Sequence, residues 1–121
     1  MFKNFLLVGL GGCLGSMIRY AVWLFFRPVN FPTATLLVNI AGSLVIGIVI
    51  GLSMKDVNFS QGWKIFLATG ICGGFTTFSA FSAENLQMLQ NGKYLLSLLY
   101  ISSSIIFGIA AAWLGFKLVT S

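Results

Sequence analysis

The sequence has no histidine and only two acidic residues, Asp56 and Glu84, among its 121 residues. Acid–base catalysis and catalytic metal sites draw most often on imidazole groups and on neighbouring carboxylates. The chain therefore lacks the side chains that hydrolytic and metal-dependent enzymes need. We expect that the protein is not an enzyme.

Charged residues of either sign are scarce. They make up 7% of the chain, against about 25% in soluble domains. The hydrophobic share is 58% and the mean hydropathy is +0.98, which is more apolar surface than one small soluble core can hide. The seven basic residues give a net charge of +5, but they are scattered singly rather than clustered as nucleic-acid binding requires. We expect a protein of the lipid bilayer that does not bind nucleic acid.

Cysteine is also rare. Cys13 and Cys72 both lie within apolar stretches, where a free thiol behaves as a small hydrophobic side chain. A disulfide or a zinc site is therefore not expected.

Long apolar stretches fill most of the chain. A helix needs about 20 apolar residues to cross the hydrocarbon, which leaves room for four crossings with short connections. The predicted spans cover residues 5–26, 33–54, 62–89 and 94–119. The first three end at Arg27-Pro28, Lys55-Asp56 and Asn91-Gly92, which are residues typical of helix ends. The sequence predicts an all-α, multi-pass protein of the cell membrane, with residues 1–121 forming one four-helix domain.

The basic residues give almost no preference for one orientation in the membrane. With four spans, both termini and the middle connection lie on one side, which holds Lys3, Lys55, Lys64 and Lys117. The other side holds Arg27 and Lys93, and also Arg19 if that side chain reaches the interface. Two interpretations stay open: noise in a short protein, or a chain that inserts both ways and pairs with an inverted copy.

The middle of the third span is rich in small and polar residues. Gly70, Gly73, Gly74, Thr76 and Thr77 fall within eight positions, and glycine costs about 1 kcal/mol relative to alanine inside a helix. We predict a local break in this helix, whose freed carbonyl groups can hold an ion. The alternative is that the small residues only allow close helix packing. We expect that packing role for the glycines at positions 11, 15, 47 and 51.

Two phenylalanines follow this stretch. Phe78 and Phe81 are three residues apart and share a helix face, with Ser79 and Ser82 on an adjoining face. The edge of a phenyl ring is positive, so two ring edges beside a dry passage favour an anion without any fixed charge. The alternative is a lipid-facing or core role, as for most phenylalanines in an apolar chain.

Other polar residues of the four spans need an explanation. Arg19 is deep in the first span, where an ionisable residue suggests a function, unless its side chain extends to the interface. Asn39 in the second span is either part of a site or a hydrogen-bonded link between helices. Tyr100 and Ser104 share a face of the fourth span and predict a polar track, unless the hydroxyl groups bind only their own backbone. For Glu84 we favour a rim or structural position, since its charge repels anions.

Several short motifs stand out together. They are Gly11-Gly12, Gly15 and Arg19-Tyr20 in the first span, Val38-Asn39 and Gly42 in the second, and Gly73 to Ser79 with Phe81-Ser82 in the third. With these motifs the chain resembles the Fluc family of fluoride channels, also called CrcB proteins, over nearly its whole length. Ala80 departs from the threonine common in the family, and Phe75 stands where leucine is frequent. Neither departure removes a group on which the resemblance depends.

The resemblance implies an antiparallel, dual-topology homodimer with two anion pores. It also implies a structural sodium ion at the dimer centre, bound by the backbone oxygens of Gly73 and Thr76 from both chains. Such a cation would add positive potential between the two copies.

The resemblance further implies that the protein lets cytoplasmic fluoride leave the cell passively and so lowers fluoride toxicity. The inside-negative membrane potential drives an anion outward without another energy source. The residues implied to line the fluoride pore are Phe78, Phe81, Asn39, Ser79, Tyr100, Ser104 and, near the vestibule, Arg19.

Two other functions stay open on the sequence. A small dual-topology, proton-coupled exporter has a similar size and helix number, but it needs a membrane-buried carboxylate, usually early in the chain, where this sequence has Arg19. A structural subunit of a membrane complex needs only glycine-rich packing faces, and it does not explain the threonine and phenylalanine pairs of the third span.

Overall fold

The computed structural model describes residues 1–27 and 31–121, and every regular element in these ranges is helical. Four helical stretches are long and apolar enough to cross a membrane: Phe2–Phe25, Thr33–Lys55, Gln61–Gln90 and Tyr94–Thr120. The predicted all-α fold with four spans is confirmed, and the predicted ends lie within three residues of the observed ones. Pro28, which we expected to close the first span together with Arg27, lies outside the described residues.

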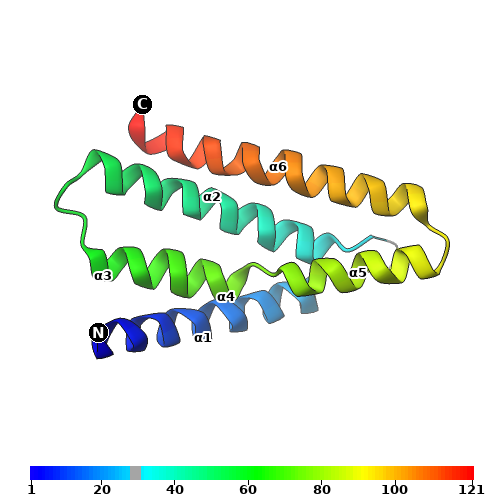
Figure 1. Cartoon of the computed structure of the whole chain (residues 1–121), viewed down its shortest axis with the longest axis horizontal. Helices are drawn as coiled ribbons and strands as arrows, with labels where there is room; N and C mark the ends of the chain where they lie inside the picture. The colour runs from blue at the N-terminus through cyan, green and yellow to red at the C-terminus, as the bar shows by residue number, and fades with distance from the viewer. Residues whose placement is uncertain (28–30) are drawn as a thin grey trace.

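The four spans pack as two close pairs. Helix α1 (Phe2–Phe25) lies along the first half of the third span, and α2 (Thr33–Lys55) lies along α6 (Tyr94–Thr120) (Figure 1). Both termini and the connection between α2 and α3 lie at the same end of the bundle, as four crossings require. The closest packing therefore joins elements that are far apart in the sequence.

The third span is interrupted. It consists, in order, of α3 (Gln61–Lys64), the π-helix η1 (Ile65–Cys72), α4 (Gly73–Phe75), two extended residues and α5 (Phe78–Gln90). The extended residues are Thr76, with φ −84° and ψ 157°, and Thr77, with φ −151° and ψ 124°. The predicted break is confirmed, and it separates α4 from α5 in Figure 1.

The glycines that we counted at the break are not its extended residues. Gly70 and Gly74 are helical, and a Cβ atom on Gly74 would lie 2.5 Å from the carbonyl oxygen of Gly12. A Cβ atom on Gly70 would lie 2.9 Å from the Cα atom of Gly11. These glycines let η1 and α4 touch the backbone of α1, so the packing interpretation holds for them. The extended conformation falls instead on two β-branched threonines, which suit it.

Small residues also bring α2 and α6 together. Gly47 of α2 faces the backbone carbonyl of Ala112, and Gly115 of α6 faces that of Leu44. The packing role expected for Gly47 is thereby confirmed, and Gly11, Gly15 and Gly51 also contact a neighbouring helix. The backbone contact between α2 and α6 leaves no room for larger side chains at these positions.

A matched pair of glycine substitutions tests this packing. Gly47→Ala places a methyl group against the Ala112 carbonyl, so we expect it to lower the free energy of unfolding by about 1–3 kcal/mol. Gly9→Ala is the control, because a Cβ atom there meets nothing within 4 Å. It should leave stability unchanged or raise it by up to about 1 kcal/mol through helix propensity. Reversible unfolding in detergent micelles measures both, and equal effects of the two changes would contradict the packing account.

Candidate functional site

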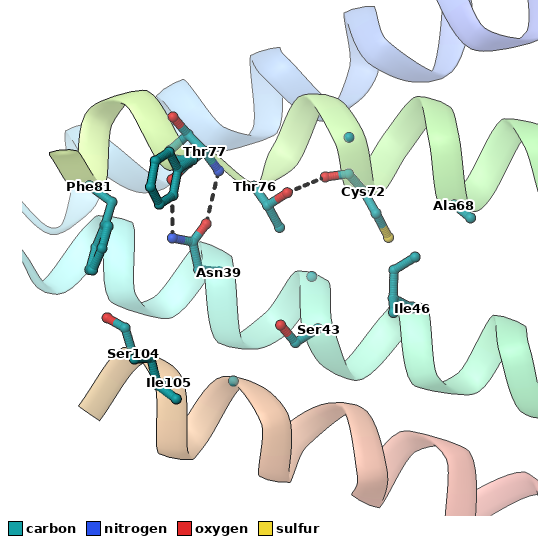
Figure 2. Close-up of a pocket in the computed structure, with 14 residues that line it drawn as sticks. Asn39, Ser43, Ile46, Ala68, Cys72, Thr76, Thr77, Phe81, Ser104 and Ile105 are labelled. Atoms are coloured by element: carbon teal, nitrogen blue, oxygen red, sulfur yellow. Dashed lines mark hydrogen bonds between the residues drawn. The ribbon is translucent and has the colours of Figure 1, made fainter. Parts of the chain in front are cut away.

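The break is held by one side chain of α2. The Asn39 Nδ2 atom donates to the Thr77 carbonyl oxygen at 3.2 Å, and the Thr77 backbone N–H donates to Asn39 Oδ1 at 2.9 Å (Figure 2). In an uninterrupted helix the Thr77 N–H would bind the carbonyl of Gly73. Asn39 takes that donor, so the Gly73 carbonyl loses its helical partner.

A second hydrogen bond releases another carbonyl. The Thr77 hydroxyl accepts from the backbone N–H of Ala80 at 3.1 Å and so caps the start of α5. In a continuous helix that N–H would bind the Thr76 carbonyl. The carbonyl groups of Gly73 and Thr76, which the resemblance implies to be sodium ligands, are thus the two whose helical donors are bound elsewhere. Oxygen atoms of unwound backbone are the kind of ligand that sodium takes within membranes, although a sodium site here stays a prediction.

Arg19 points toward the break. Its Nε atom donates to the Gly74 carbonyl oxygen at 3.0 Å, across the contact between α1 and α4. Arg19 is therefore directed toward the third span, and its depth relative to the membrane interface stays a prediction. Asn39 and Arg19, which lie on different helices, meet the third span three residues apart.

A cavity of about 500 Å³ lies beside the break between α2, the third span and α6. Its polar lining comes from Asn39, Ser43, Thr76, Thr77 and Ser104, most of which Figure 2 shows around one space. The buried Ser104 hydroxyl has no hydrogen-bond partner within residues 1–27 and 31–121. This unpartnered hydroxyl lies in the wall of the cavity, where neighbouring atoms cover its oxygen.

Aromatic rings form a row along this cavity. The ring centroids of Phe78 and Phe81 lie 5.9 Å apart, and those of Phe81 and Tyr100 lie 4.9 Å apart, both pairs in tilted arrangements. Phe78 and Phe81 line the cavity, and 78% of the Phe78 surface is exposed. The exposed Phe78 ring does not belong to a closed core, so a lipid-facing role and a role beside a ligand or a partner chain both stay open.

Not every predicted pore residue lines a cavity. Ser79 is exposed, and its hydroxyl lies 3.3 Å from that of Thr77, outside the lining of the 500 Å³ cavity. Tyr100 is fully buried and also lies outside this lining, although its ring packs on Phe81. The pore roles of all these residues stay predictions.

Glu84 has a structural position that the sequence favoured without naming its partners. Its Oε2 atom accepts from the Thr35 hydroxyl and its Oε1 atom from the Tyr100 hydroxyl, each at 2.7 Å. These bonds tie α5 to α2 and α6. Our sequence analysis missed Thr35, and the available signal was weak: a hydroxyl near the start of one span and a carboxylate near the end of another.

A second cavity, of about 290 Å³, lies near the far side of the break. It is lined by Arg19, Thr35, Thr77 and Glu84, among others, and it shares Thr77 with the first cavity. Both cavities therefore adjoin Thr77, one of the two extended residues. The 290 Å³ cavity is also lined by one basic residue, Arg19, and one acidic residue, Glu84.

Comparison with known proteins decides the family. Residues 6–116 match the family model described as "CrcB-like protein, Camphor Resistance (CrcB)". The chain belongs to the CrcB family. A relative from Azobacteroides pseudotrichonymphae, named fluoride-specific ion channel FluC, is 46% identical over 98% of this chain and 97% of its own length. The FluC protein of Flavobacterium psychrophilum is 47% identical over 93% of this chain and 94% of its own.

More distant CrcB relatives carry the same name. FluC 1 of Listeria monocytogenes is 38% identical over 98% of both chains. The family is one of ion channels and not of enzymes, as we expected. These relatives support neither a proton-coupled exporter nor a structural subunit.

The position of Asn39 in this CrcB protein yields a prediction. Asn39→Leu keeps the size of the side chain and removes both hydrogen bonds to Thr77, so the part-buried Thr77 N–H loses its partner and the Thr77 carbonyl loses one donor. We expect the free energy of unfolding to fall by about 1–3 kcal/mol, measured in detergent micelles. Asn4→Leu, at an exposed position of α1, is the control and should change stability little. Wild-type stability in Asn39→Leu would show that the break does not need this side chain.

Proposed function

We propose that the protein is a fluoride-selective channel through which cytoplasmic fluoride leaves passively. The observation that carries this proposal is the 46–47% identity, over nearly the full chain, to proteins named fluoride-specific ion channels. Hydrogen fluoride is neutral, crosses membranes and dissociates inside a less acidic cell. The inside-negative potential then drives the anion out, so a channel alone lowers fluoride toxicity.

The proposal includes a second copy of the chain in the opposite orientation. Gly73 is exposed, a Cβ atom there would meet nothing within 4 Å, and the neighbouring Phe78 is 78% exposed. This face also carries the polar lining of the 500 Å³ cavity. Lipid tails offer no hydrogen bonds to such groups, whereas a protein partner does. The near-even distribution of basic residues on the two sides favours an inverted copy over a parallel one.

The proposal places a structural sodium ion between the two copies. Within one chain the Gly73 and Thr76 carbonyls supply two released oxygens beside the open face, and two are too few to surround a cation. An inverted copy would present the same two groups from the other side. When bound, the ion would supply a fixed positive charge at the dimer centre.

The proposed pore runs along the aromatic row and the 500 Å³ cavity. Fluoride must exchange tightly held water for other donors, as ions do in selectivity filters. The ring edges of Phe78 and Phe81 are weak donors of this kind. The Ser104 hydroxyl is unpartnered in the described structure, and the Asn39 amide carries a second N–H besides the one that binds Thr77. We propose Ser79, Tyr100 and Arg19 as further polar groups near the path.

Ion flux from liposomes tests the channel directly. Purified protein in liposomes under an imposed potential should release fluoride and not chloride, because only the chain itself is needed to form the pore. Light scattering on the same purified protein in detergent micelles should give the mass of two chains. Chloride release at the rate of fluoride, proton-coupled cation uptake, or no flux would contradict the proposal.

The aromatic row provides a sharper prediction. Phe81→Ile keeps an apolar side chain but removes a ring edge beside the cavity. We expect fluoride flux to fall about tenfold or more, which corresponds to a barrier higher by about 1.4 kcal/mol. Phe107→Ile, on the exposed face of α6, is the matched control and should conduct as the wild type does. Equal flux in the two folded variants would remove the ring-edge mechanism.

A further inference from the structure

The Gly74 carbonyl lies where the first half of the third span ends. Helix α4 (Gly73–Phe75) stops one residue later, so the last carbonyl groups of this helical segment need partners from outside it. The Gly74 carbonyl oxygen accepts a hydrogen bond from the Arg19 Nε–H, with 3.0 Å between oxygen and nitrogen. A cation at the carboxyl end of a helix also interacts favourably with the helix dipole, most strongly in partly buried sites.

Close packing fixes the distance between Arg19 and this carbonyl. Gly11, Gly15 and Arg19 follow one another at intervals of four residues, so they share one face of α1. A Cβ atom on Gly11 would lie 2.6 Å from the Phe66 carbonyl oxygen, and one on Gly15 would lie 2.9 Å from the Phe75 nitrogen. The backbone of α1 is therefore pressed against η1 and α4 along the same face that presents Arg19.

The bond to Gly74 also lies between the two released carbonyl groups. Gly73 precedes Gly74 directly, and Thr76 follows it after one residue. Asn39 holds the break from α2, through Thr77. Arg19 is the side chain that binds the other end of the break, from α1. Movement of the Gly74 peptide would turn the carbonyls on both sides of it.

We propose that Arg19 is a positioning residue of the break: its Nε–H fixes the Gly74 carbonyl and thereby sets the direction of the Gly73 and Thr76 carbonyls. The hydrogen bond made by Nε, rather than the positive charge, is the feature on which this role depends. The terminal nitrogens of the same guanidinium stay available to the 290 Å³ cavity, which Arg19 lines. This positioning role rests on the proposed channel function only in the test that measures ion flux. The tests of stability and of carbonyl conformation do not depend on that function.

Two substitutions separate the hydrogen bond from the charge. In Arg19→Gln the amide nitrogen is as many bonds from Cα as the arginine Nε atom, so it can reach the Gly74 carbonyl, but it carries no charge. Arg19→Met has a similar length and neither a donor nor a charge. Arg27→Gln is the control for lost charge on the same side of the membrane, because Arg27 is exposed and its guanidinium lies 5.8 Å from the Trp23 ring centroid.

Three measurements are made on each full-length variant: the melting temperature in detergent, the ¹³C shift of the Gly74 carbonyl in bilayers, and fluoride efflux from liposomes. We expect Arg19→Gln to keep the melting temperature and the Gly74 shift close to those of the wild type, and its flux is compared only with that of Arg19→Met, because Arg19 is also proposed to lie near the ion path. Arg19→Met should melt lower and show a displaced shift. Its flux should be at least about tenfold below that of Arg19→Gln, because a hydrogen bond to this carbonyl is lost.

Each remaining outcome also bears on the proposal. If Arg19→Gln and Arg19→Met change the melting temperature and the Gly74 shift equally, the proposal is overturned, because the positive charge is then the feature that matters. If Arg19→Met behaves as the wild type does, the proposal is also overturned, because Arg19 then has no positioning role. If Arg19→Met does not fold, a folded Arg19→Gln with the wild-type Gly74 shift supports the proposal, and an unfolded one contradicts it. If the wild-type protein carries no fluoride, the proposed function fails, while the melting temperatures and carbonyl shifts still decide the role of Arg19.

Discussion

In the hydrocarbon of a membrane every backbone N–H and C=O needs a partner within the protein. The third span departs from a continuous helix at Thr76 and Thr77, so the structure depends on how this departure is satisfied. Asn39 pairs with both backbone groups of Thr77, and the Thr77 hydroxyl caps the helix that follows. Side chains thus bind the Thr77 backbone groups and the Ala80 N–H, which would otherwise lack partners at the break.

This replacement determines which backbone groups become free. Because Asn39 and the Thr77 hydroxyl take two amide donors, the carbonyls of Gly73 and Thr76 lose theirs. Both groups adjoin a face with an exposed glycine, an exposed phenylalanine and a polar cavity. Helices α1 and α2 thus hold the break from two sides. The released groups lie at the surface where we propose that an inverted copy, a cation and the ion path meet.

Much of the fold follows from the sequence, because long apolar stretches with few charges permit little besides membrane helices. The position of the break was also predictable, but its extended residues were not: Gly70 and Gly74 serve backbone contact with α1, and the threonines carry the extended conformation. The bonds of Glu84 to Thr35 and Tyr100 join residues 49 and 16 positions apart. Such pairs depend on the rotation and depth of packed helices, which hydropathy does not specify.

The conformation of Thr76 and Thr77 in a lipid bilayer tests the central claim most directly. Solid-state NMR of the reconstituted protein gives the ¹³Cα and ¹³Cβ shifts of these two threonines, which differ between helical and extended backbone. The account predicts extended shifts at both residues, between helical shifts at Gly74 and at Ala80. Helical shifts across Thr76 and Thr77, which mean an unbroken third helix, would contradict it.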